Sequence, residues 1–106
     1  MPHTKKTAAT LPYPPPGETI LEDYMKPLGL TAYAMSKALG IQPIALSKIL
    51  AGERSLTAEM ALRLERVTGA EAKVWLNLQA QYDLAKARGD KAILAKVDRA
   101  HPLQVA

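Results

Sequence analysis

The segment from Ala32 to Ala51 constrains the fold more than any other part of the chain. It contains two runs of helix-forming residues separated by Gly40, which lacks a Cβ and can take the positive φ of a tight corner. Ser36 is small at the point where two such helices would cross. The apolar residues expected between the helices are Met35, Leu39, Ile41, Leu46 and Ile49. The segment is therefore predicted to fold as a helix-turn-helix, with helices at about 32–39 and 43–51.

The outward face of this motif is positively charged. Between Thr31 and Gly52 the charged residues are Lys37 and Lys48, with no acid, so this face can approach phosphates without repulsion. We interpret the motif as a DNA-binding module with affinity for double-stranded DNA. The residues expected to contact DNA are Thr31, Tyr33, Lys37, Gln42, Pro43, Ile44, Ser47, Lys48 and Arg54.

The residue types at the start of the second helix indicate a base preference. Gln42 can form a bidentate pair with adenine, and Pro43 or Ile44 can contact the methyl group of thymine, so A·T pairs are favoured. Structural interpretations remain open for two of the other residues. Thr31 is also a good helix N-cap, and Tyr33 is also suited to a partly buried position.

Composition favours one all-α domain. A chain of 106 residues suits a single core, and it is rich in Ala and Leu, contains no Phe and shows no alternating strand pattern. The predicted organisation is a mobile Pro-rich tail at 1–15, a helix-turn-helix domain at 16–88 and a helical extension at 89–106.

Helix signals also occur outside the motif. A first helix is expected after Pro16 and Gly17 and is expected to stop at Pro27 and Gly29. Thr57 is a predicted N-cap for a helix that ends at Gly69. The longest helix is predicted at about 71–87, and a last one at about 91–99.

Two copies of the chain are expected to act together, because a helix-turn-helix reads a palindrome with two recognition helices about 34 Å apart. The residues considered for contact with a second copy or another protein are Trp75, Leu84, Ile93, Leu94 and Val97. Trp75 has a second interpretation as a core residue, since a small domain needs its largest apolar side chain inside.

Catalysis is not expected. His3 and His101 lie near the two ends, Cys is absent, and no metal-binding spacing or phosphate-binding loop occurs, so no catalytic residue, metal or cofactor is predicted. Glu59, Glu65 and Asp83 are expected on solvated helix faces, with neighbours four residues away. The sequence contains no run of about 20 apolar residues, so no membrane-spanning helix is predicted. The protein is expected to be cytoplasmic.

Three separated blocks resemble the HigA antitoxins, also called VapI-type proteins, of the XRE (Cro/C1-like) group: PPPGETILEDYMKPLGLT, GERSLTAEMALRLERVTG and VWLNLQAQYDL. The resemblance implies a five- to six-helix λ-repressor-like domain. It also implies a homodimer that represses its own operon at a palindromic operator and neutralises a HigB-like, ribosome-dependent mRNA-cleaving toxin.

The chain departs from these antitoxins at the start of the recognition helix. They usually have a small polar residue there, followed by polar or basic ones, whereas this chain has Gln42, Pro43 and Ile44. Part of the sequence preference is therefore expected to come from DNA shape. Two alternatives remain open: a stand-alone XRE-type regulator, and a toxin-masking module that binds DNA weakly.

Overall fold

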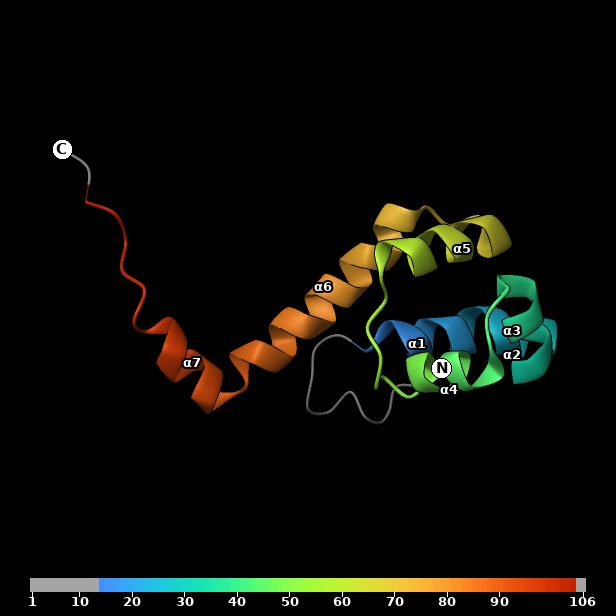
Figure 1. Ribbon diagram of the computed structural model, residues 1–106, viewed down its shortest axis with the longest axis horizontal. Coiled ribbons are helices and arrows are strands. Elements are labelled where there is room, and N and C mark those ends of the chain that lie inside the picture. The colour runs from blue at the N-terminus through green and yellow to red at the C-terminus, as the bar shows by residue number, and fades with distance from the viewer. Residues whose placement is uncertain (1–13, 105–106) are drawn as a thin grey trace.

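The computed structural model of the protein describes residues 14–104. Within these residues every regular element is a helix (Figure 1). The elements are α1 Pro16–Thr19, η2 Ile20–Met25, α2 Lys26–Leu28, α3 Ala32–Leu39, α4 Pro43–Leu50, α5 Ala58–Thr68, α6 Ala72–Arg88 and α7 Lys91–Val97. The first three form one continuous helix. The all-α prediction is confirmed. The predicted tail at 1–15 falls almost entirely outside the described residues, as do residues 105–106.

The first helix differs from its prediction at Pro27. The helix passes through this proline and ends at Gly29, whose φ is 66°. Its middle turns are π-helical, and the backbone N–H of Lys26 donates to the carbonyl oxygen of Leu21, five residues back. A proline in an α-helix clashes with the carbonyl group four residues earlier, and the wider π turn gives the ring room. The expectation that Pro27 stops this helix is therefore wrong.

The predicted caps around the motif are present. The hydroxyl group of Thr31 accepts the N–H of Ala34 at 3.0 Å, and that of Thr57 accepts the N–H of Met60 at 3.1 Å. Gly40 has a φ of 73° and closes α3. These signals are local to the sequence, so they act as predicted once the helices form.

The core lies where α1, η2, α3, α4, α5 and the first half of α6 meet. Its buried apolar residues are Ile20, Met25, Met35, Leu39, Leu46, Ile49, Leu56, Ala61, Leu64 and Trp75. Trp75 is 1% exposed, and its ring centroid lies 5.7 Å from that of Tyr24. Burial inside its own domain leaves Trp75 no surface for a partner. Of its two interpretations, the core position is the one observed.

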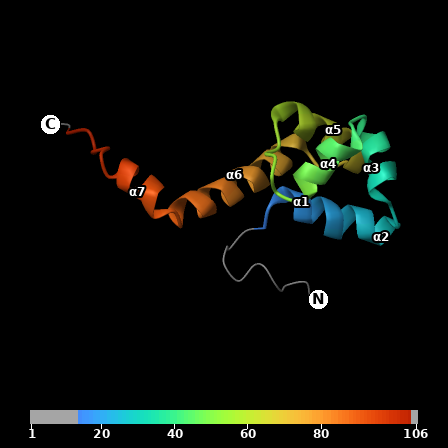
Figure 2. The ribbon, with the colours of Figure 1, turned by 60° about the horizontal axis from the view of Figure 1, so that its bottom comes forward.

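The C-terminal part of the molecule extends away from this core. The second half of α6 leaves the compact body, and α7 packs only on the end of α6 among the major contacts of residues 14–104 (Figures 1 and 2). We call the second half of α6 together with α7 the arm. Because of the arm the molecule is elongated, with principal-axis extents of 56 × 29 × 23 Å and a radius of gyration of 16.5 Å. A compact chain of this length has a radius of gyration of about 13 Å. No helix of residues 14–104 is long and apolar enough to cross a membrane.

Gly17 allows α1 to pack closely against α4, the second helix of the motif. A Cβ at Gly17 would lie 2.2 Å from the carbonyl oxygen of Ile49 and 2.6 Å from the Cα of Leu50. Both of these atoms belong to backbone, so a side chain at position 17 requires the two helices to separate.

We expect Gly17→Ala to lower the free energy of unfolding by about 1–3 kcal/mol, the usual cost of overpacking. Alanine is a better helix former than glycine, so a loss of stability would show that the steric overlap with α4 outweighs the gain in helix propensity. Gly89→Ala is the matched control, because a Cβ there meets its nearest atoms at an ordinary 3.7 Å. Thermal or urea unfolding measures both variants, and a Gly17→Ala protein as stable as the wild type would contradict this account.

Candidate nucleic-acid interface

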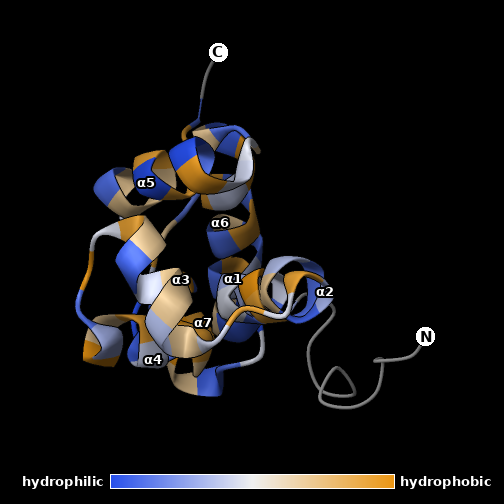
Figure 3. Ribbon diagram, turned by 90° about the vertical axis from the view of Figure 1, so that its right-hand side faces the viewer, coloured by the Kyte–Doolittle hydropathy of each residue, from blue (hydrophilic) through white to orange (hydrophobic). Residues whose placement is uncertain are grey.

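The helix α4 has one buried side and one open side. Leu46 and Ile49 are 0% and 3% exposed and face the core, which fixes how the helix is rotated. On the open side Ile44 is 67% exposed. Gln42, Pro43, Ser47 and Lys48 are exposed as well. The structure thus exposes the five predicted residues of α4 and its N-cap, Gln42. The helix α4 belongs to the compact body, away from α7 (Figure 1), and Figure 3 shows it beside α3 from the side of that body.

The start of α3 contributes the next group of predicted residues. Thr31 is the N-cap of α3 and is exposed, so capping leaves its hydroxyl group accessible. Tyr33 is 63% exposed, which contradicts its interpretation as a partly buried aromatic. The ammonium group of Lys37 lies 5.6 Å from the centroid of the Tyr33 ring. A cation over an aromatic face is attracted to it, so this contact holds Lys37 near the start of α3.

Three cations of the predicted interface are available for phosphate. Lys37, Lys48 and Arg54 are exposed and take part in neither of the ion pairs between described residues, Glu22–Lys26 and Glu59–Arg63. Arg54 lies in the loop between α4 and α5, next to an exposed acid, Glu53. Free guanidinium and ammonium groups at the rim of an exposed helix are suited to neutralising a phosphate backbone.

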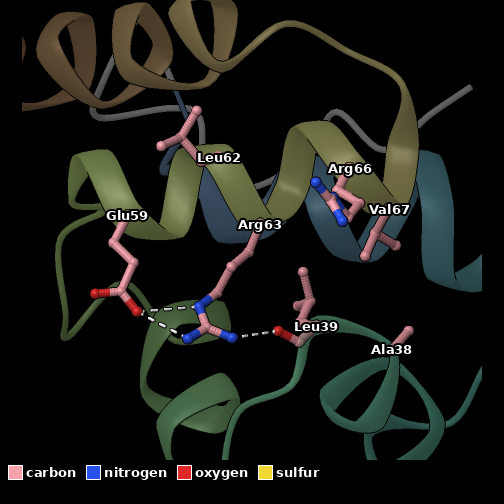
Figure 4. Close-up of a pocket in the computed structure, with 7 residues that line it drawn as sticks. All are labelled: Ala38, Leu39, Glu59, Leu62, Arg63, Arg66 and Val67. Atoms are coloured by element: carbon pink, nitrogen blue, oxygen red, sulfur yellow. Dashed lines mark hydrogen bonds and ion pairs between the residues drawn. The ribbon is translucent and has the colours of Figure 1, made fainter.

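The corner between α3 and α4 is held by a residue that the sequence analysis missed. Arg63 of α5 donates from Nη1 to the carbonyl oxygens of Leu39 at 2.9 Å and Gly40 at 3.1 Å (Figure 4). Its Nε and Nη2 donate to Glu59, at 3.2 and 2.8 Å, which fixes the plane of the guanidinium group. Arg63 therefore bonds the carbonyl group of the last residue of α3, which has no partner within the helix, and that of the C-cap Gly40.

Two polar side chains connect α6 to the rest of the domain. Glu65 of α5 accepts the backbone N–H of Ala72 at 3.0 Å and so caps the start of α6. Gln79 is 8% exposed and accepts the N–H of Leu56 at 2.8 Å, while its Nε2 donates to Asp83 at 2.9 Å. Glu59 and Asp83 lie on exposed helix faces and bond neighbours four residues away, Arg63 and Gln79, as expected. The expectation is wrong for Glu65, which is half-buried and binds a backbone N–H at the start of α6. A polar residue four positions after Trp75, on the buried stripe of α6, was the signal in the sequence for Gln79.

The exposed side chains of this surface are of kinds that bind DNA. Within residues 14–104 no three His, Cys, Asp or Glu side chains lie close enough to hold a metal ion. The exposed groups of α3, α4 and the following loop are hydroxyl, amide, aliphatic, aromatic and cationic, with Glu53 as an exposed acid in the loop. This combination matches base edges, thymine methyl groups and phosphates.

Known proteins share this fold and sequence. The helix-turn-helix family profile matches residues 21–75. Virulence-associated protein I of Dichelobacter nodosus is 47% identical over 76 residues, which are 72% of this chain and 70% of that protein. The antitoxin HigA of Pseudomonas aeruginosa, solved with the higBA promoter, aligns with a TM-score of 0.74 and 29% identity over 84% of this chain and 96% of that one. The antitoxin GraA in complex with its operator aligns with a TM-score of 0.76 and 30% identity over 98% and 100%.

These similarities confirm the fold class and the resemblance noted in the sequence. Helix-turn-helix regulators and antitoxins of this kind are not enzymes, in agreement with the sequence prediction. The chain belongs to the helix-turn-helix family, in its XRE-type branch, together with the HigA antitoxins and virulence-associated protein I.

Proposed function

We propose that this protein is a HigA-type antitoxin that acts as a homodimer, represses its own operon at a palindromic operator and neutralises a HigB-like, mRNA-cleaving toxin. The observation that carries the DNA-binding part is the uncovered side of α4, whose rotation is fixed by buried Leu46 and Ile49. Solved relatives titled as complexes with promoter or operator DNA support it.

The recognition surface suits the major groove. Gln42 precedes α4 and Pro43 opens it, so the amide group of Gln42 lies at the helix tip, which enters the groove first. The exposed aliphatic side chain of Ile44 offers contact with a thymine methyl group, and Ser47 follows one turn later. Thr31, Tyr33, Lys37 and Arg54 would then bind phosphates on either side of the groove.

The arm formed by the end of α6 and by α7 is proposed as the contact with a second copy. Its exposed apolar residues, with exposed fractions of 39–57%, are Leu84, Ile93, Leu94 and Val97. Apolar side chains gathered on a helix that leaves the core are suited to burial against the same residues of a partner in a two-fold dimer. A dimer made through this arm leaves α4 of each copy uncovered.

Toxin neutralisation is proposed from family membership. A protein 32% identical over 68 residues is named antitoxin HigA-1 in Vibrio cholerae, and the match covers 64% of each chain. A stand-alone regulator would share the DNA-binding surface but would lack a toxin gene beside its own gene.

Binding to the DNA just upstream of the gene tests the repressor function. Replacing Gln42, Ser47 and Lys48 together with Ala is expected to cost about 2–4 kcal/mol of specific binding, at about 1–3 kcal/mol for each good base contact. Lys37→Ala is the matched control. It should weaken binding to all sequences alike and reduce the salt slope by about one unit. Gel-shift titrations at several salt concentrations measure both, and wild-type binding no tighter than to random duplex would remove the repressor function.

Introducing negatively charged residues into the arm tests the proposed dimer. Ile93→Asp and Leu94→Asp together are expected to convert a dimer into a monomer, because two carboxylates would be buried in the proposed interface. Sedimentation or light scattering measures the mass. Leu28→Asp is the control, since Leu28 is 69% exposed on the main body. A wild-type protein that binds its full operator as a monomer would contradict the proposal.

The antitoxin function is tested by co-expression with the product of the adjacent small gene. We expect that gene to inhibit growth when it is expressed alone and the wild-type chain to restore growth. The Gln42, Ser47 and Lys48 variant should also restore growth, because these three residues lie on the surface proposed for DNA. A failure of the wild-type chain to restore growth in the presence of a toxic neighbour would exclude neutralisation.

A further inference from the structure

The loop between α4 and α5 carries Arg54 and is anchored on both sides of it. On the near side, the backbone N–H groups of Glu53 and Arg54 donate to the carbonyl oxygen of Lys48, at 2.9 and 3.3 Å. On the far side, Leu56 buries its side chain to 5% exposure and donates its N–H to Oε1 of Gln79 on α6 at 2.8 Å. The loop that carries Arg54 is therefore hydrogen-bonded to α4 before Arg54 and to α6 after it.

Glutamine is the side chain that this position requires. The buried Leu56 N–H needs an acceptor, and the exposed Asp83 carboxylate accepts from Nε2 at 2.9 Å. The Gln79 amide supplies one of each, and its two partners fix which way the amide group points. A leucine would leave a buried N–H unbonded, whereas a glutamate would place two carboxylates together.

Other residues of α6 also lie beside the loop that carries Arg54. Gln79 and Tyr82 of α6 line a crevice together with Gly52 and Arg54 of the loop. Gly52 has a φ of 79°, and a Cβ there would lie 3.7 Å from the hydroxyl oxygen of Tyr82. One face of α6 therefore packs along the loop that carries Arg54.

We propose that Gln79 is a positioning residue of the DNA interface: by holding Leu56 from α6, it fixes the α4–α5 loop so that Arg54 meets a DNA phosphate. Gln79 itself is buried and does not touch DNA. The inference rests on the proposed DNA-binding function and adds to it a residue outside the helix-turn-helix motif.

A double-mutant cycle with Arg54 tests the proposal. Gln79→Leu and Arg54→Ala should each weaken operator binding by about threefold to tenfold and each reduce the salt slope by about one unit, the effect of one phosphate contact. In the Arg54→Ala background, Gln79→Leu should have no further effect, because the contact that it positions is already absent. Effects that multiply would overturn the proposal and indicate general destabilisation.

A swapped pair separates positioning from loss of folding. Gln79→Glu alone should weaken binding, because the new carboxylate lies against Asp83. Combining it with Asp83→Asn should restore binding and the salt slope, since a carboxylate can accept from Leu56 while the new amide donates. Circular dichroism confirms that each variant is folded. A swapped pair that is folded but binds no better than Gln79→Glu would also overturn the proposal.

One further measurement is independent of DNA. Hydrogen exchange of the Leu56 amide should be faster in Gln79→Leu than in the wild type, and unchanged protection would refute the proposal. If the wild type does not prefer its operator to random duplex while this exchange still responds, the repressor function fails and the role of Gln79 is limited to the loop.

Discussion

The position of the recognition helix depends on how the corner at Gly40 is held. At the end of α3 the backbone turns with a φ of 73° at Gly40, and the final carbonyl groups of the helix are left without partners within it. Arg63 donates from α5 to the carbonyl oxygens of Leu39, the last residue of α3, and of Gly40, and Glu59, one turn earlier on α5, holds the guanidinium group in place. Since the C-terminal end of a helix carries partial negative charge, a cation there is also favourable.

The C-terminal end of α4 is held by a different kind of contact. At Gly17 the backbones of α1 and α4 approach so closely that even a Cβ would collide with the carbonyl oxygen of Ile49. Hydrogen bonds thus fix the start of α4 through the corner, and close backbone packing fixes its end. Between these two points Leu46 is fully buried, so the helix has one favourable rotation and Ile44 is left on the open side.

The sequence predicts those features that depend on neighbours in the chain. The caps at Thr31 and Thr57, the corner at Gly40 and the exposed row on α4 follow from spacing and residue type alone. Arg63, Glu65 and Gln79 were missed because their acceptors and donors lie on other elements, seven to 24 residues away. Pro27 was misinterpreted for a related reason: the π turn that accommodates it forms over the preceding residues and leaves no recognised pattern in the sequence.

The length of α6 separates the two surfaces on which the proposed function depends. A helix of 17 residues spans about 26 Å, but the core covers only its first half, where Trp75 is buried. Its middle holds the Arg54 loop through Gln79, and its end presents Leu84, which is 50% exposed, to solvent. A second copy bound at this end would not cover the exposed side of α4, which lies on the compact body. The proposed dimer contact and the proposed DNA surface therefore do not compete for the same residues.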